Sequence, residues 1–218
     1  MKGRWIKKLF LTFALLSLLV IGAVGAAGYY LTRPLAIEFS QAPNVVEAEE
    51  ANRKLKLLSQ AQSSRKQGFI RFNEVEINSF LDGKYHGDAT NAPVRLLKAG
   101  LLLGEGNLTF VTWHQAVVYG VNLPFVWQRV IAPQRTTNGW SFSVQSMRVG
   151  EVEIPEGHWP TVEKVLGATD ALFAERKEWL KTLPLVTLAS NEESKTPEVR
   201  LYTYLPEEKS KVNETVTE

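Results

Sequence analysis

The feature that most constrains this chain is a long uncharged segment near its N-terminus. From Leu9 to Thr32 there are 24 consecutive residues without a charge, most of them Leu, Phe, Val, Ile, Ala or Gly. A helix rises about 1.5 Å per residue, so about 20 such residues cross the hydrocarbon core of a bilayer. Trp5 lies at one border and Tyr29–Tyr30 at the other, where aromatic side chains favour the headgroup region. The segment therefore predicts a transmembrane helix.

The charges on either side of this segment predict its orientation. The basic residues Lys2, Arg4, Lys7 and Lys8 precede it, whereas Arg33 is the one basic residue in the linker that we predict over 33–44. Because basic flanks tend to stay in the cytoplasm, residues 1–32 are expected to form a cytoplasmic basic flank and an integral membrane anchor, with the N-terminus inside. The remainder of the chain is then outside the cytoplasm.

A cleaved signal peptide is the alternative interpretation of the same residues. Met1–Lys8 would be its basic region and Leu9–Ile21 its apolar region, and the small residues of Ala23–Ala27 offer a cleavage site near Ala27. The apolar stretch continues to Leu31, which is longer than usual for a signal peptide and favours the anchor. Both interpretations place the domain outside the cytoplasm, either membrane-anchored or secreted to the periplasm. N-terminal sequencing of the mature protein separates them.

The basic flank also explains the overall charge. The chain has 25 Lys and Arg against 23 Asp and Glu, and without the four basic residues that precede Leu9 the remainder holds 21 basic residues and a net charge of −2. Nucleic-acid binding needs a basic surface that displaces counterions from phosphates, so we predict no nucleic-acid partner. The chain has no cysteine, which excludes disulfides, thiolate metal sites and a lipidated cysteine.

Apolar periodicity predicts helices on both sides of a β-rich centre. Residues 45–62 predict an amphipathic helix, either a stalk or coiled-coil arm beside the membrane or a helix packed on its own domain; a stripe of two to three heptads favours the second. After a short strand at Phe69–Phe72, Asn73 and Glu76 resemble a capping box, so a helix is expected over 74–82, ending near Gly83. Another amphipathic helix is expected over 160–181, and then two strands at Leu183–Ala189 and Val199–Leu205.

Residues 94–154 predict an antiparallel β-meander. Gly104–Asn107 separates two apolar runs as a hairpin turn would, and Asn138-Gly139 is a strong hairpin signal. Between these turns, alternation with a period of two places five large apolar side chains on one face: Tyr119, Val121, Leu123, Phe125 and Trp127. Pro124 cannot donate to a ladder, so the strand is expected to be bulged or at an edge there.

The predicted fold class is therefore α+β. An N-terminal transmembrane helix precedes an extracytoplasmic domain at 45–205, in which a curved antiparallel β-meander packs against two or three amphipathic helices, and residues 206–218 are expected to be a disordered tail.

No pattern in the chain predicts catalysis, a cofactor or a metal site. His86, His114 and His158 are isolated, and Glu151 and Glu153 alternate on a strand end as solvated residues commonly do. There is no nucleophile elbow, phosphate-binding glycine loop or dinucleotide fingerprint. We therefore predict a protein that is not an enzyme and needs no cofactor.

Aromatic residues on the predicted strands are the candidate ligand-binding site. They would line the inner face of the curved sheet, with the helices at 74–82 and 160–181 available to cover it. Two interpretations stay open, because aromatic side chains dominate ordinary cores and an apolar ligand groove would need a cavity between sheet and helix. The five candidates are Tyr119, Phe125, Trp127, Trp140 and Phe142.

The order of these elements resembles a known group of proteins. A basic N-terminus and membrane helix, an Asn-bearing helix at 76–81, a β-meander and the Gly-x-x-x-Ile-Pro strand end at 150–155 are similar to the uncharacterised YpmS-type single-pass bacterial proteins. The resemblance extends more distantly to LmeA-type and tubular lipid-binding (BPI-like) envelope proteins. It implies a long curved sheet wrapped on a helix, sometimes holding lipid, and it implies no catalytic residues.

Two functions follow from these expectations. The first is a membrane-anchored extracytoplasmic binding domain without catalytic activity, for lipid or another apolar ligand. The alternative is an envelope assembly or scaffold protein that contacts a protein partner through the 45–62 helix or an exposed strand edge.

Overall fold

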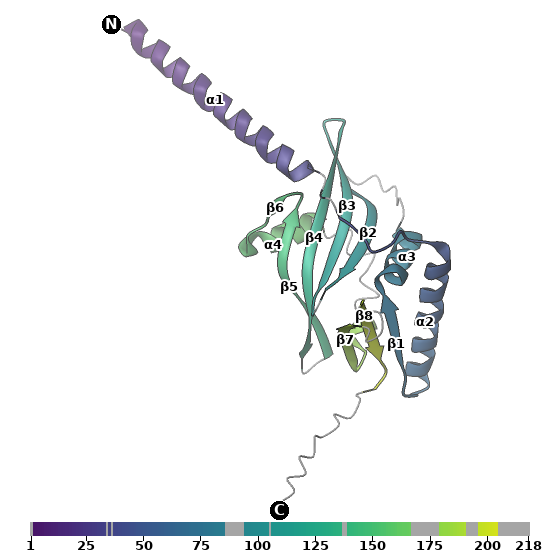
Figure 1. The fold of residues 1–218 in the computed structure, drawn as a ribbon. Helices are drawn as coiled ribbons and strands as arrows, with labels where there is room; N and C mark the ends of the chain where they lie inside the picture. Colours follow the sequence, from purple (N-terminus) through teal and green to yellow (C-terminus); the bar gives the residue numbers. More distant parts are fainter. Residues whose placement is uncertain are drawn as a thin grey trace, which may run out of the picture.

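A computed structural model describes residues 2–33, 35, 37–85, 94–104, 106–136, 139–166, 179–190 and 196–204; of residues 2–15, 84–85, 135–136 and 139–140 it describes the backbone alone. Over these residues the protein is α+β, with a five-stranded antiparallel sheet, a three-stranded antiparallel sheet and helices around them (Figure 1). The predicted fold class and meander are confirmed at this level. The predicted tail at 206–218 lies outside the described residues.

The five-stranded sheet is a meander in which each strand pairs with the next along the chain. Its strands are β2 (Val94–Leu103), β3 (Leu108–Val118), β4 (Val121–Thr136), β5 (Gly139–Val149) and β6 (Val152–Glu153). The predicted connections at 104–107 and 136–139 do join paired strands. Pro124 lies opposite Gln115 of β3, but β5 pairs with β4 only from Trp127 to Thr136. Pro124 is therefore on an edge segment, as predicted.

The second sheet joins the two ends of the domain. Its order is β1 (Phe69–Asn73), β8 (Pro197–Tyr202) and β7 (Leu185–Ser190). Every second residue of these strands faces a hydrophobic core shared with the helices, with Phe72 and Leu201 at 4% exposure. The strands were expected from the sequence, whereas the pairing of β1 with β8 was not.

Two helices cover this core. In α2 (Val45–Ser63), Ala51 and Leu58 are almost fully buried, and the helix packs on α3 (Glu74–Tyr85) and on β1. This confirms that α2 is a helix of its own domain rather than a free stalk. The predicted end of α3 near Gly83 is wrong by about one half turn, because the helix continues to Tyr85. Gly83 has open space around its Cα, and a helix tolerates an isolated glycine at modest cost.

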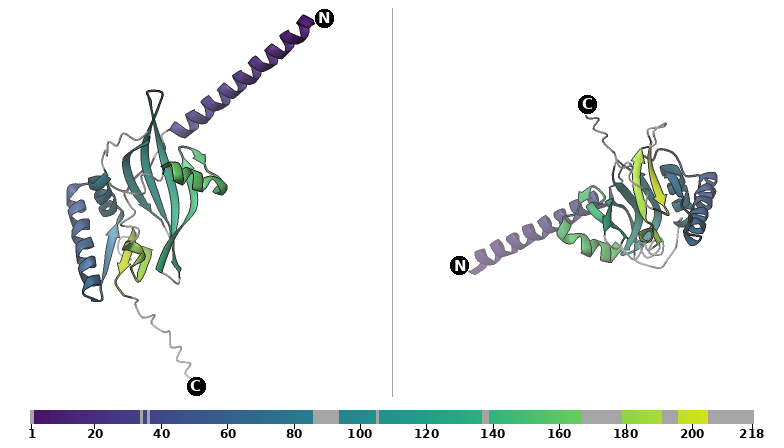
Figure 2. Two further views of the ribbon diagram at one scale, coloured as in Figure 1. Left: turned by 180° about the vertical axis from the view of Figure 1, so that it is seen from behind. Right: turned by 90° about the horizontal axis from the view of Figure 1, so that it is seen from below.

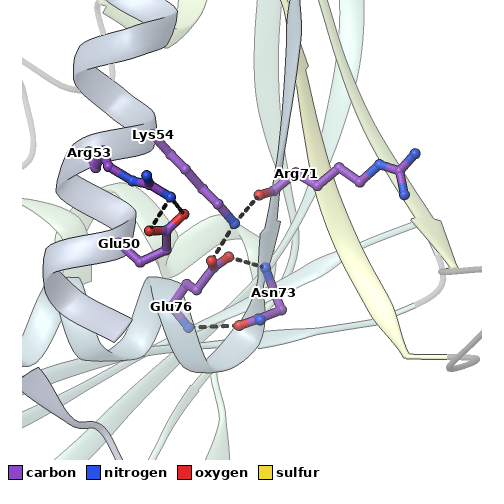
Figure 3. Close-up of polar contacts among 6 residues, drawn as sticks. All are labelled: Glu50, Arg53, Lys54, Arg71, Asn73 and Glu76. Carbon is purple, nitrogen blue, oxygen red and sulfur yellow. Dashed lines mark hydrogen bonds and ion pairs between the residues drawn. The ribbon is translucent and has the colours of Figure 1, made fainter. Parts of the chain in front are cut away.

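A buried ion pair joins α2 to the junction of β1 and α3 (Figure 3). Asn73 and Glu76 form the predicted capping box: the Glu76 N–H donates to Asn73 Oδ1 at 2.8 Å, and the Asn73 N–H donates to Glu76 Oε2 at 3.0 Å. The ammonium of Lys54 in α2 contacts the other Glu76 oxygen and donates to the Arg71 carbonyl at 2.9 Å. Because the Glu76 side chain is 4% exposed, its charge depends on these partners.

A second ion pair on α2 lies in solvent. Arg53 contacts Glu50 one turn earlier at 2.7 Å, and the Arg53 side chain is 70% exposed. Their hydrogen bond lowers the pKa of Glu50 and raises the pKa of Arg53. Pairs of this kind contribute little to stability, so this pair is a control for the buried one beside it in Figure 3.

Polar side chains of α3 cover the outer edge of β2. The Asn78 Nδ2 donates to the Leu101 carbonyl at 2.9 Å, and the Leu101 N–H donates to Asn78 Oδ1 at 2.6 Å. The Leu103 N–H donates to a Glu74 carboxylate oxygen at 3.2 Å. The side chain of Asn78 thus replaces a neighbouring strand and satisfies backbone groups that an edge would expose. Ile77 and Phe80 of the same helix pack with Leu101, Leu103 and Leu108, which the strand register places on the face that carries Trp127. The expected cover by the helix at 74–82 is therefore confirmed at the Leu103–Leu108 end of that face.

Replacing Asn78 with alanine is expected to lower the free energy of unfolding by about 2–3 kcal/mol, because it leaves the partly buried N–H and carbonyl of Leu101 without their partners. Asn52→Ala is the matched control, since the Asn52 amide makes one exposed bond to Ala48 within α2. Chemical denaturation of both variants, followed by circular dichroism, measures the difference. Equal stabilities would show that the amide of Asn78 does not hold the edge.

The N-terminal helix is docked on the turn between β5 and β6 by its last residues. In α1 (Lys2–Thr32), the Tyr30 carbonyl accepts from the Glu151 N–H at 3.1 Å, and just beyond the helix Arg33 pairs with the Glu151 carboxylate at 3.2 Å. Gly150 has a φ of +56°, and a Cβ there would lie 2.5 Å from the Tyr30 carbonyl oxygen, so only glycine allows this approach.

The rest of α1 projects away from the domain (Figure 1). Within the part of the chain that the structure describes, no helix is long and apolar enough to cross a membrane. The transmembrane helix predicted for Leu9–Thr32 therefore stays a prediction.

Candidate functional site

The aromatic face of the five-stranded sheet is formed by alternate residues of β3 and β4. Residues that lie opposite each other in an antiparallel pair project to the same face. The register therefore places three cross-strand pairs in a row on this face: Phe125 with His114, Trp127 with Thr112, and Arg129 with Phe110.

Aromatic and polar groups alternate within this row. The Arg129 guanidinium lies 3.9 Å from the Trp127 ring centroid and 5.1 Å from that of Phe110. The His114 ring stacks on Phe125 at 5.2 Å, and its Nε2 lies 2.8 Å from Thr112 Oγ1. Trp127 and His114 are 0% exposed. The polar groups are thus buried in an apolar face, where cation–π and hydrogen-bond contacts offset part of the desolvation cost.

The centre of the face is a filled core. Trp127 and Met147 are fully buried and pack against Leu166 of α4 (Trp159–Leu166), with Trp159 and Val162 around them. Figure 2 shows α4 on one side of the five-stranded sheet and the α2–α3 pair on the other side of the molecule. Cover by the start of the helix predicted at 160–181 is confirmed, and residues 167–178 of that helix lie outside the described residues.

The five predicted site residues have different surroundings. Trp127 belongs to the filled core, and Phe125 and Phe142 are half-buried on the same face. The placement of Tyr119 on this face is wrong: it lies in the two-residue turn between β3 and β4, and its side chain is fully exposed. Trp140 lies opposite Arg135 in the β4–β5 ladder, and its side chain is outside the described residues.

An apolar row continues from the core toward the β3–β4 turn. Its members lie opposite each other on β2, β3 and β4, on the face that carries Trp127. Val118 and Val121, nearest the turn, are exposed, and the others are half-buried. We call these residues the apolar row: Val94, Ala116, Val118, Val121, Leu123 and Phe125. The period-two pattern predicted the common face of Val121, Leu123, Phe125 and Trp127, and the register confirms it.

Sequence reasoning missed the buried polar residues of the face. His114 had been treated as incidental, and Thr112 and Arg129 were not singled out, because one strand pattern does not show which strand lies opposite. Among the described residues no group of three His, Asp or Glu side chains could hold a metal ion. Glu151, one of the two alternating carboxylates, pairs with Arg33.

Comparison with known protein families, with curated proteins and with solved structures gives no match to this chain. The resemblance to YpmS-type and LmeA-type proteins therefore stays a prediction.

Proposed function

We propose that the protein is a membrane-anchored extracytoplasmic domain without catalytic activity, which binds lipid or another apolar ligand through the apolar row. The observation that carries the proposal is that α4 covers the aromatic face at its centre but not toward the β3–β4 turn. Its centre at Trp127 is filled by α4, whereas the row from Phe125 to Val121 is left partly exposed toward the β3–β4 turn. Exposed apolar surface of this kind often marks a binding site.

The surface of α1 supports the membrane anchor. Leu16, Leu18, Leu19 and Ile21 are each more than 60% exposed, so apolar side chains surround the helix on all sides rather than forming one packed stripe. A helix that is apolar all round needs an apolar environment. The uncharged stretch from Leu9 to Thr32 is long enough to reach across a bilayer.

The scaffold alternative has less support. It relied in part on the apolar stripe of α2, and Ala51 and Leu58 of that stripe are already buried against the same domain. Of the exposed residues of α2 most are polar or charged, although Val45, Val46 and Leu57 are also exposed.

Replacing Leu123 with aspartate is expected to reduce the lipid that co-purifies with the full-length protein by about tenfold, because a carboxylate within the apolar row opposes contact with acyl chains. Native mass spectrometry of the protein in mild detergent measures the retained lipid. Val165→Asp is the matched control: Val165 is an apolar residue of α4, 60% exposed, outside the apolar row.

Lipid that merely surrounds the anchor is retained equally by both variants, so the comparison isolates the apolar row. A circular dichroism spectrum shows whether Leu123→Asp is folded, and Leu123→Asn is the milder replacement if it is not. Equal lipid retention by folded variants at Leu123 and at Val165 would contradict the proposal.

A further inference from the structure

We propose that the β3–β4 hairpin is a membrane contact: its tip, residues 117–121, places Tyr119 in the headgroup region of the outer leaflet beside α1. This inference rests on the membrane anchor of the proposed function. It concerns a bilayer surface rather than a ligand held on the sheet.

The backbone of the turn first draws attention to Tyr119. Tyr119 and Gly120 have φ values of +50° and +79°, which are the signs of a type I′ turn. Asparagine or aspartate is preferred at the first of these positions, and a bulky side chain with positive φ is strained. The Tyr119 side chain is fully exposed, so packing against the domain does not offset this strain. A strained, unpacked tyrosine at a turn that asparagine would suit better points to a contact outside the domain.

The surface around the turn suits the interface of a membrane. Val117, Val118 and Val121 are 36%, 44% and 58% exposed on the two strands that meet at the tip. No Asp, Glu, Lys or Arg occurs between Glu105 and Arg129, so no charge has to be desolvated when the tip approaches lipid. An uncharged, apolar strand edge is an aggregation hazard in water, and soluble proteins commonly protect such edges with charges. Tyrosine itself favours the membrane–water interface.

The docking of α1 places the tip on the membrane side of the domain. The last turn of α1 contacts the β5–β6 turn, and the Gly150 N–H donates to the Val126 carbonyl at 2.8 Å, next to the segment of β4 that leads to the tip. Figures 1 and 2 show the β3–β4 hairpin extending from the sheet to the side of the domain from which α1 leaves. The exposed rings of Tyr29 and Tyr30 lie at the same end of α1. If that end meets the membrane surface, the tip meets it too.

The absence of cysteine allows a direct test with single-cysteine variants of the full chain. Asn122→Cys carries an environment-sensitive fluorophore next to the tip and leaves Tyr119 in place. Ser63→Cys carries it at the end of α2, on the far side of the domain from α1 (Figure 1). Both are reconstituted into phosphatidylcholine–phosphatidylglycerol vesicles that contain lipids with a quencher near the headgroup. Quenching is expected to be at least about twofold stronger at Asn122 than at Ser63, since interfacial groups lie about 5–10 Å deep.

A second variant tests the role of the tyrosine itself. Tyr119→Asn in the Asn122→Cys background should fold at least as well, because asparagine suits the turn, and should lose most of the quenching. Equal quenching at Asn122 and Ser63 in protein that floats with the vesicles would overturn the hairpin inference and leave the anchor intact. Disulfide-linked dimers of the unlabelled Asn122→Cys variant would also overturn it, in favour of a second copy of the chain. Failure of the protein to float would overturn the anchor and the inference together.

Discussion

Replacing Trp127 with alanine is expected to lower the free energy of unfolding by about 3–5 kcal/mol. Trp127 is 0% exposed, and its ring contacts the Arg129 guanidinium and lies in the core with Met147 and Leu166. Its removal would open a cavity between the sheet and α4 and would take away the nearer of the two aromatic rings beside the buried charge of Arg129. Thermal and chemical unfolding of the full-length protein in detergent measures the change.

Tyr119→Ala is the control for Trp127→Ala. Both residues belong to the aromatic set expected from the sequence, but the fully exposed Tyr119 side chain should change stability by less than about 0.5 kcal/mol. If Trp127→Ala instead kept its stability and lost bound lipid, Trp127 would line a groove rather than a core. The pair of variants therefore decides between the two interpretations that the sequence left open.

Replacing Lys54 with methionine is expected to lower the free energy of unfolding by about 3 kcal/mol. Methionine keeps most of the apolar part of the side chain beside Phe72 but removes the positive charge. The Glu76 carboxylate, 4% exposed, would then keep its capping bond to Asn73 and lose its counter-charge. The Arg71 carbonyl would lose a donor as well. Because the Lys54 side chain is itself 24% exposed, the expected loss of stability lies at the low end of the range that follows from breaking a buried ion pair.

Two comparisons make this prediction specific. Arg53→Met, which breaks the neighbouring exposed pair with Glu50, should cost less than about 1 kcal/mol. The double variant Lys54→Met/Glu76→Gln should recover most of the lost stability, since glutamine can serve at this capping position without a charge to neutralise. Equal losses from Lys54→Met and Arg53→Met would show that burial does not distinguish the two pairs.

Local chemistry explains which parts of the fold were predictable. The helix at 45–62, the capping box of Asn73 and Glu76, and the hairpins at 104–107 and 136–139 all depend on residues close together in the chain, and all are confirmed. The turn at Tyr119–Gly120 was missed for the same kind of reason. Tyrosine is an unusual residue for the first position of that turn, so the alternation of apolar residues extended the predicted strand through it.

The candidate site was only partly predictable, because its character depends on what covers each residue. The alternation of apolar residues correctly placed Phe125 and Trp127 on one face. It could not show that α4 buries Trp127 while Val121 is exposed to solvent. It also could not show that His114 and Arg129 share this face, since that depends on the register between β3 and β4.

The sequence by itself determined the uncharged N-terminal helix, the α+β class and the meander, because each follows from periodicity or composition over neighbouring residues. Tertiary structure alone decided the pairing of β1 with β8, the cover of the β2 edge by Asn78, and the docking of α1 against Gly150. Those contacts join residues far apart in the chain, and their energies come from buried partners that no local pattern specifies. The docking of α1 also leaves its last turn on the side of the domain toward which the β3–β4 hairpin extends.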